Sequence, residues 1–264
     1  MPDSLARSGF MQRSFAGFFA SVGDVSIFAL RALRDVFRPP FEIREIVRQL
    51  FEVGWRSCPL VTVSGFAFGV VLALQTRASM ESFGAQAMIP QAVSFGLFRD
   101  VGPLIAALLV AGRAGAGIGA QLAGMRVTEQ IDALEALAID SFKYLVVTRI
   151  VACIIAIPIL TVLLDFAGLL GGMASDLIAL HMSVALFLND AFGPMSWSDY
   201  VPPTMKTIVF GFIIGTLSCY LGYTASQGAA GVGRASTRSV VFSSLLVIVA
   251  DAILVKSILF WFPG

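Results

Sequence analysis

The sequence contains five long apolar blocks, and these constrain its fold more than any other feature. They cover residues 57–76, 91–118, 144–179, 204–224 and 239–262. An α-helix needs about 20 apolar residues to cross the hydrocarbon core of a bilayer, and each block is long enough. Since lipid offers the backbone no hydrogen-bond partners, only helices satisfy their polar groups within one segment. The sequence therefore predicts an all-α integral membrane protein with five transmembrane helices.

The composition agrees with this class and argues against several others. Hydrophobic residues make up 57% of the chain and charged residues 13%, against roughly 25% charged residues in soluble domains. The formal net charge is +1, whereas a nucleic-acid partner requires a concentrated basic face. The isolated Cys58, Cys153, Cys219 and His181 lack the spacing of metal ligands. We expect no metal site and no nucleic-acid binding.

Two segments outside the blocks have the periodicity of amphipathic helices. Residues 41–55 place apolar side chains on one side and charged or amide side chains on the other, which predicts an interfacial helix before span one. In residues 126–139, apolar residues recur every three or four positions. This favours a cytoplasmic coupling helix between spans two and three, with a solvated loop as the alternative. We place an N-terminal cytoplasmic or interfacial segment at residues 1–38 and the membrane domain at 39–264.

Glycine and proline residues bear on whether span three is continuous and on how closely span two packs against another helix. The third block exceeds one crossing, and Pro158 or the glycines of residues 168–172 could kink or divide it. Gly115 and Gly119 in span two have the four-residue spacing that lets membrane helices approach closely. We expect them to pack against another helix, either within the chain or across a dimer.

The distribution of basic residues predicts the orientation. Of the 18 Lys and Arg residues, all but Arg77, Arg99, Lys206 and Lys256 fall on one side of the predicted topology. Cytoplasmic loops carry the excess of Lys and Arg, so the N-terminus should be cytoplasmic and the C-terminus external.

Charged residues inside the spans are the main candidates for function, because the sequence has no catalytic motif. No Gly-Lys pair occurs, which excludes a phosphate-binding loop of the G-x-x-x-x-G-K-[ST] type. An intramembrane charge costs several kcal/mol unless it is paired or hydrated. The adjacent Arg99 and Asp100 point about 100° apart on a helix, so they cannot simply neutralise one another. We favour a place on the wall of a polar cavity, with an ion-pair network that fixes helix packing as the alternative. For Asp165, Asp251 and Lys256 we favour a packing role.

Three stretches of the sequence resemble the MlaE family, the permease subunits of Mce-linked ABC transporters that move phospholipid across the Gram-negative envelope. They are VRQLFEVGWRSCPLVTVSGFAFGVVLALQ, FRDVGPLIAALLVAGRAGAGIGAQLAGMRVTEQIDALEALAID and GVGRASTRSVVFSSLLVIVADAIL. The resemblance extends from about Arg44 to Phe262.

The resemblance implies an assembly. The permease would form a homodimer in the bacterial inner membrane, beneath a hexameric Mce-domain periplasmic subunit and above a pair of ABC ATPases. ATP and Mg²⁺ would bind to the ATPases, so this chain would be a non-catalytic subunit without a cofactor of its own.

The resemblance also implies two sites. A lipid cavity at the dimer interface, open to the periplasmic side, would include Leu72, Gln75, Phe83, Arg99 and Asp100. The ATPase contact would lie at about residues 120–140 and include Arg126, Glu129, Gln130 and Asp132.

Three positions depart from the family pattern. Asp100 and Gln121 stand where the family usually has Glu, and Ser141 stands where it usually has Pro. Asp100 keeps the charge with a shorter reach, Gln121 removes a charge near the expected ATPase contact, and Ser141 lacks the rigid turn.

We therefore expect a permease subunit that moves phospholipids between the inner and outer membranes and maintains the lipid asymmetry of the outer membrane. One alternative is an Mce system that carries another hydrophobic cargo, such as a steroid. A secondary transporter working alone is another, although the chain shows no internal repeat of the kind such transporters have. A membrane anchor that only holds partners would tolerate substitution of Arg99 and Asp100.

Overall fold

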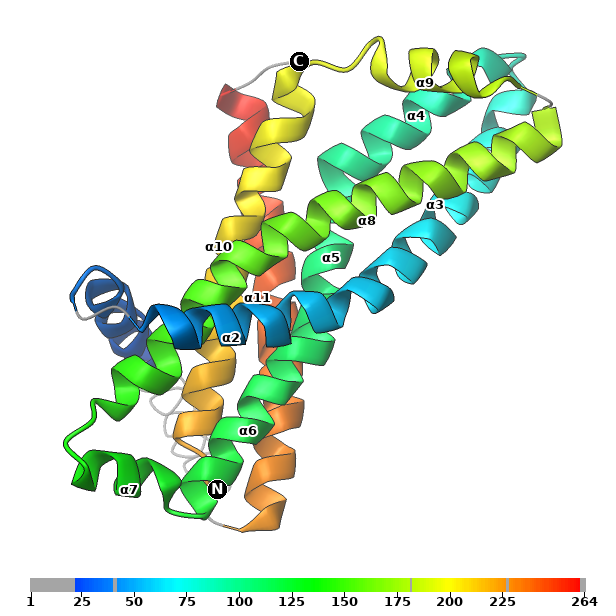
Figure 1. The fold of residues 1–264 in the computed structure, drawn as a ribbon. Helices are drawn as coiled ribbons and strands as arrows, with labels where there is room; N and C mark the ends of the chain where they lie inside the picture. Colours follow the sequence, from blue (N-terminus) through cyan, green and yellow to red (C-terminus); the bar gives the residue numbers. More distant parts are fainter. Residues whose placement is uncertain (1–21, 40–41, 181, 227, 262–264) are drawn as a thin grey trace, which may run out of the picture.

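The structure, a computed structural model, describes residues 22–39, 42–180, 182–226 and 228–261, and it is helical with no strand in these parts. Five helical segments in the described residues are long and apolar enough to cross a membrane. They are Ile43–Glu81, Ile89–Val127, Lys143–Ala179, Trp197–Tyr223 and Ala229–Ile258. The predicted all-α fold with five spans is confirmed. Figure 1 shows an elongated bundle with the short helices α7 and α9 at opposite ends, here called the α7 end and the α9 end.

Span one begins with the predicted amphipathic helix. Helix α2 (Ile43–Val53) lies across the bundle and leads through a short turn (Trp55–Ser57) into α3 (Cys58–Glu81), as Figure 1 shows. Its polar side faces the protein: Glu45 and Gln49 are buried, and Gln49 Nε2 donates a hydrogen bond of 2.7 Å to Glu45 Oε1. Its apolar side, with Val47 and Phe51, is exposed. This arrangement suits a helix that rests in a lipid interface.

Span two contains two π-helical turns between its α-helical parts. It runs through α4 (Ile89–Phe95), a π-turn (Gly96–Val101), α5 (Gly102–Val110), a second π-turn (Ala111–Gly115) and α6 (Ala116–Val127). The first π-turn carries Arg99 and Asp100, and the second carries Arg113. Since π-turns inside α-helices occur frequently at functional sites, both positions are candidates.

Span three is one continuous run, so the glycines of residues 168–172 do not divide it. After a π-turn (Lys143–Val147), α8 (Thr148–Leu180) extends over 33 residues with Pro158 inside it. The glycines serve a close crossing with α3 instead. A Cβ atom at Gly69 would overlap the carbonyl group of Gly168, and one at Gly65 would overlap the backbone of Leu164. The two backbones therefore touch where they cross.

Spans four and five complete the bundle. The short helix α9 (Val184–Phe192) precedes α10 (Trp197–Tyr223), which is followed by α11 (Ala229–Trp261). The predicted start of span four at residue 204 is wrong by two helical turns. Pro202 and Pro203 lie inside α10 in its second turn. The helix begins with a capping box, in which Ser196 N donates to Asp199 Oδ2 at 3.0 Å.

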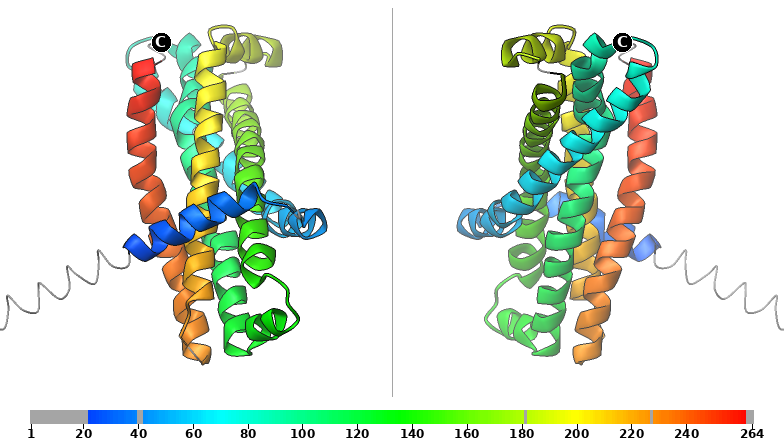
Figure 2. Two further views of the ribbon diagram at one scale, coloured as in Figure 1. Left: turned by 90° about the vertical axis from the view of Figure 1, so that its left-hand side faces the viewer. Right: turned by 90° about the vertical axis from the view of Figure 1, so that its right-hand side faces the viewer.

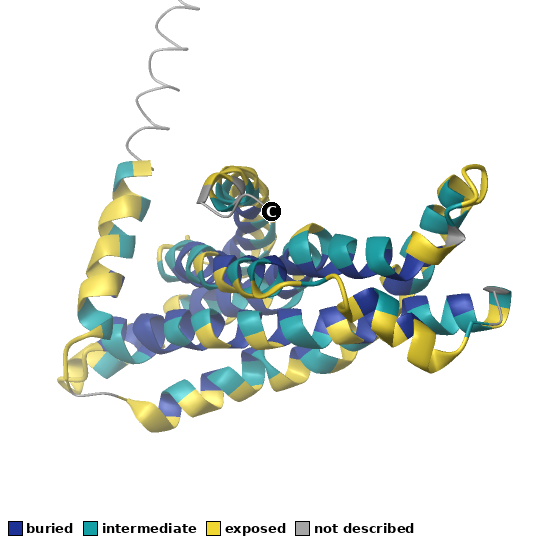
Figure 3. Cartoon of the chain, turned by 90° about the horizontal axis from the view of Figure 1, so that it is seen from above, coloured by how far each residue is buried: buried dark blue, intermediate teal, exposed yellow. Residues whose placement is uncertain are grey.

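The glycines of span two pack within the chain. A Cβ atom at Gly119 would collide with Ser239 of α11, and one at Gly115 would lie 3.0 Å from the Ser218 hydroxyl of α10. Figure 3, viewed along the bundle, shows buried residues on the inward faces of the helices and exposed residues outside. The core is built mainly from spans two, three and four, including Leu122, Ile150, Leu164, Phe210 and Ile214.

A helix that the sequence did not predict covers residues 22–36. Figure 2 shows it crossing the outside of the bundle near the level of α2. The Phe28 ring lies 5.0 Å from the ring of Phe142 and 5.5 Å from that of Tyr220, and Ala32 is fully buried. Residues 1–21 of the predicted N-terminal segment, and His181, lie outside the described residues.

Candidate functional site

A cluster of charged side chains connects spans two, four and five toward the α9 end. Arg99 Nη1 lies 3.7 Å from Asp199 Oδ1 on α10, and Lys206 Nζ lies 2.9 Å from Asp251 Oδ1 on α11. Lys206 Nζ also donates to the Arg99 carbonyl oxygen at 3.4 Å. Lys206 is only 4% exposed, so its charge depends on Asp251. These contacts support the ion-pair interpretation for Arg99.

The sequence reasoning missed Asp199 and Lys206, although a signal was present. The two residues are seven positions apart on α10, which is two helical turns, so they share a face. Asp100 is exposed and not ion-paired in the described chain; with Arg99 and Lys206 it lines a small hollow. Arg99 and Asp100 thus lie beside one small hollow, and their place in a lipid cavity stays a prediction.

The other three predicted cavity residues lie on or beyond α3. Leu72 is half-buried, and its Cδ2 atom would be 3.4 Å from a Cβ atom at Gly96. Gln75 is exposed, and Phe83 is 84% exposed just beyond the end of the helix. Within the described chain, no hydrogen bond or ion pair joins these side chains to Arg99. Their role in a lipid cavity stays a prediction.

The remaining intramembrane charges differ in their surroundings. The Asp251 ion pair with Lys206 is of the packing kind we favoured for that residue. Asp165 is fully buried, and neither of its carboxylate oxygens has a hydrogen-bond partner among the described residues. Its Oδ1 atom occupies the space that a side chain at Gly102 would need. Lys256 is exposed.

At the α7 end, the chain makes a tight turn between α6 and α7 (Gln130–Ala136). The predicted helix over residues 126–139 is therefore two helices. The break occurs at Glu129, whose φ of 57° is left-handed and cannot continue a helix. Arg126 Nη1 lies 2.7 Å from Asp132 Oδ1 across the turn. All four predicted ATPase-contact residues, Arg126, Glu129, Gln130 and Asp132, are exposed here.

Helix α7 is fixed to the bundle although its outer side is exposed. Ile131, on the inner side of α7, is fully buried. The Ser141 hydroxyl donates to Glu135 Oε1 (2.6 Å), and Tyr223 from α10 donates to the same oxygen at 3.3 Å. Ser141 therefore holds the turn by hydrogen bonds, where a proline would hold it by ring geometry. Leu137 is 71% exposed, so the element presents an apolar as well as an acidic surface.

Gln121 lies next to a buried cation. Arg149, on α8, is 2% exposed; its Nη2 donates to Gln121 Oε1 at 3.1 Å and its Nη1 to the Leu145 carbonyl oxygen at 2.6 Å. The Arg149 Nε atom has no partner in the described chain, which also offers this guanidinium no carboxylate within ion-pair distance. A carboxylate at position 121 would lie where it could neutralise Arg149.

A chain with these five apolar spans and polar contacts between them is a multi-pass membrane protein. Comparison with known proteins gives the family: the model described as "Permease MlaE" matches residues 46–256. The chain belongs to the MlaE permease family.

The curated relatives agree with this assignment. A probable ABC transporter permease protein of Rickettsia felis is 41% identical over 239 residues, which cover 90% of this chain and 92% of the relative. A probable ABC transporter permease protein of Synechocystis is 34% identical over 79% of each chain. The intermembrane phospholipid transport system permease protein MlaE of Haemophilus influenzae is 30% identical over 90% of this chain and 91% of the relative.

Proposed function

We propose that this chain is the membrane-spanning subunit of an ABC transporter that moves phospholipid between the two membranes of a Gram-negative envelope and so maintains outer-membrane asymmetry. The names of its relatives support the transporter class, and that of the Haemophilus relative supports the cargo. The observation that carries the proposal is the α7 turn: an exposed acidic and apolar element, held firmly from below, at one end of a membrane bundle. Such an element needs a protein partner, and the ATPase is that partner.

The proposal assigns the α7 end to the cytoplasm. Arg31, Arg38, Arg126, Lys143 and Arg234 lie on segments at or near this end. Arg77, Arg99, Lys206 and Lys256 lie toward the α9 end. The positive-inside rule supports this sidedness, with the protein in the inner membrane and the C-terminus in the periplasm. A periplasmic hexamer of Mce-domain subunits would then meet the α9 end.

The connection between the α7 turn and the polar cluster suggests how the transporter couples. Helix α6 continues span two directly, and span two carries both π-turns and Arg99. A displacement of α7 by a closing ATPase dimer would therefore act along one helix on the residues beside the hollow. ATP and Mg²⁺ would remain on the ATPase, and this chain would contribute no catalytic group.

The cargo path in this proposal runs along spans one and two of a homodimer. A phospholipid has two apolar tails and a charged head, so its path needs an apolar wall with a few polar groups. Outward-facing Phe66, Phe68 and Leu74 on α3 would supply the wall. Leu72, Gln75, Phe83, Arg99 and Asp100 would line the cavity, with Arg99 and Asp100 nearest the headgroup.

The test is a charge reversal on the α7 turn. We expect Glu129→Lys together with Asp132→Lys to abolish co-purification with the ATPase and lipid-stimulated ATP hydrolysis, because two acidic groups of the contact become basic. The melting temperature of the membrane subunit should stay close to the original, since both side chains are exposed.

The matched control reverses two acidic residues toward the other end, Glu81→Lys with Asp190→Lys, and should leave ATPase binding intact. Normal ATPase association and hydrolysis in the α7 variant would overturn the docking assignment. Loss of association in both double variants would show that the effect is not specific to α7.

A further inference from the structure

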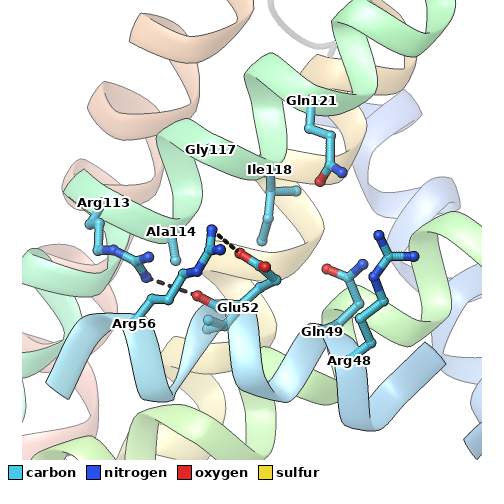
Figure 4. A pocket seen from close by; sticks show the side chains of 10 residues that line it. Arg48, Gln49, Glu52, Arg56, Arg113, Ala114, Gly117, Ile118 and Gln121 are labelled. Atoms are coloured by element: carbon cyan, nitrogen blue, oxygen red, sulfur yellow. Dashed lines mark hydrogen bonds and ion pairs between the residues drawn. The ribbon is translucent and has the colours of Figure 1, made fainter. Parts of the chain in front are cut away.

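A cavity of about 400 Å³ lies between α2 and span two, away from the polar cluster near the α9 end. Figure 4 shows Arg48 and Arg56 rising into it from the segment around α2, and Arg113 and Gln121 entering from the facing helix. Its size falls within the range of small-ligand sites, which is roughly 300–1,000 Å³. The cavity is therefore large enough for a lipid headgroup.

The charge in this cavity is unbalanced. Three arginines and one carboxylate, Glu52, line it. Glu52 Oε2 lies 2.8 Å from Arg56 Nη1, so this carboxylate already has a partner. Arg48 has only a loose contact of 3.7 Å with Glu45 and a side chain that is 72% exposed. An anion entering the cavity would meet net positive charge.

Arg113 supplies the cavity with a positioned guanidinium group. Its Nη1 atom donates to the Glu52 carbonyl oxygen at 2.9 Å and to the Ser57 hydroxyl at 2.8 Å. In the described residues it has no carboxylate within ion-pair distance. These two hydrogen bonds hold the guanidinium at the wall of the cavity without pairing it to a carboxylate. A planar guanidinium is well suited to bind two oxygens of a phosphate group.

The position of the cavity identifies the source of the phosphate. Val47 and Phe51 of α2 and Trp55 of the following turn are exposed, which is the pattern of a segment whose apolar face enters the headgroup region. The 24 residues of α3 beyond it reach about 36 Å, enough to cross a hydrocarbon core of about 30 Å from that level. The cavity therefore opens at the height of lipid headgroups on the α7 side of the membrane.

We propose that this cavity binds the phosphodiester headgroup of an anionic phospholipid from the leaflet on the α7 side. Arg113 and Arg56 contact the phosphate, Arg48 closes the outer side, and the amides of Gln49 and Gln121 are available to the polar part of the headgroup. The bound lipid joins α2 to α6. The site is separate from the cargo cavity of the proposed function and does not depend on transport.

The glycine at position 117 offers a direct way to close the site. It lines the cavity, and a Cβ atom there would meet nothing within 4 Å. We expect a leucine at this position to fill part of the cavity, since its Cβ atom has open space. Gly112 also has open space around it but does not line the cavity, so Gly112→Leu is the matched control.

The experiment measures binding of short-chain phosphatidylglycerol to the purified full chain in detergent by native mass spectrometry. We expect saturable binding that becomes about tenfold weaker in Arg113→Gln, equivalent to the loss of about 1.4 kcal/mol. Gly117→Leu should abolish the component of binding that depends on Arg113, and Gly112→Leu should not. Arg44→Gln, on the same interfacial helix but outside the cavity, should bind like the original protein.

Three ligand arms distinguish the sources of the signal. Phosphatidylcholine should bind more weakly than phosphatidylglycerol, because the cavity is net positive, and diacylglycerol should not bind there. Equal saturable binding of inorganic phosphate would overturn the lipid proposal in favour of a free-phosphate site. Unchanged phosphatidylglycerol binding in both Arg113→Gln and Gly117→Leu would overturn the site itself, whatever the outcome of the ATPase docking test.

Discussion

Arg99 and Arg113 each lie in a π-turn of span two, but their side chains have different partners. Arg99 lies 3.7 Å from Asp199, and its carbonyl oxygen accepts from Lys206, which in turn pairs with Asp251. Arg113 is held by a backbone carbonyl and a hydroxyl, neither of which carries charge. One arginine thus lies beside a carboxylate of the chain, and the other has no carboxylate within ion-pair distance among the described residues.

This difference separates an internal connection from a binding site. The pairs around Arg99 and Lys206 tie together three spans that are far apart in sequence, and they leave Asp100 as the exposed charge. Around Arg113, the neighbouring groups leave net positive charge facing an open cavity. In the proposal above, the phosphate of a lipid headgroup supplies the anion that the chain does not provide.

The largest loss of stability is expected on removal of the Asp251 carboxylate, which pairs with Lys206. We expect Asp251→Asn to destabilise the folded chain by about 3 kcal/mol or more, because Lys206 would be a buried charge without its partner. Thermal unfolding in detergent micelles measures this loss. Replacing both partners, Lys206→Met with Asp251→Leu, should restore most of it. The exposed-site control Glu81→Gln should change little, and a loss below about 1 kcal/mol in Asp251→Asn would contradict the buried-pair interpretation.

A carboxylate at position 121 would give the buried Arg149 a charged partner. We expect Gln121→Glu to raise the free energy of unfolding by about 1–3 kcal/mol, because the buried Arg149 would gain a charged hydrogen-bond acceptor. The same variant should weaken phosphatidylglycerol binding, since Gln121 also lines the Arg113 cavity. The isosteric control Gln130→Glu adds the same charge at an exposed position on α7 that makes no hydrogen bond with Arg149. Equal stabilisation in both variants would argue against an Arg149 pair.

The smallest effect on stability is expected at Arg113 itself. Arg113→Gln removes hydrogen bonds to Glu52 and Ser57 but leaves no carboxylate unpaired, so the loss should be about 1 kcal/mol. The readout is again the melting temperature, now with lipid removed. A destabilisation as large as that of Asp251→Asn would mean that Arg113 is mainly a structural residue, and the contrast with Lys206 would fail.

The spans could be predicted because their signal is local. Apolar length identifies a crossing from one stretch of sequence, and the 3.6-residue period of α2 likewise identifies its two faces. The period does not say which face turns inward. In a soluble protein the apolar face of a helix turns inward, but at a lipid surface it can turn outward. In α2, Glu45 and Gln49 are buried while Phe51 is exposed. The glycines of span three were ambiguous for a similar reason, since a helix stop and a close crossing use the same residue type.

The candidate sites could be predicted only in part because they depend on distant segments. Arg99 and Asp100 stood out as charges in an apolar block, but their partners come from α10 and α11, and pairings over such separations leave no local pattern. The π-turns are also invisible in the sequence, because they have the composition of the α-helices around them. The cavity at Arg113 requires α2 and span two to face each other, which only the fold provides.

The helix over residues 22–36 has a consequence for biogenesis. Its Phe28 ring rests on Phe142 and Tyr220, which follow it by more than a hundred residues in the chain. During synthesis, this helix is made before spans three and four, which carry the rings it packs against. It can therefore dock only after those spans have been inserted, so an early segment completes its packing late in assembly.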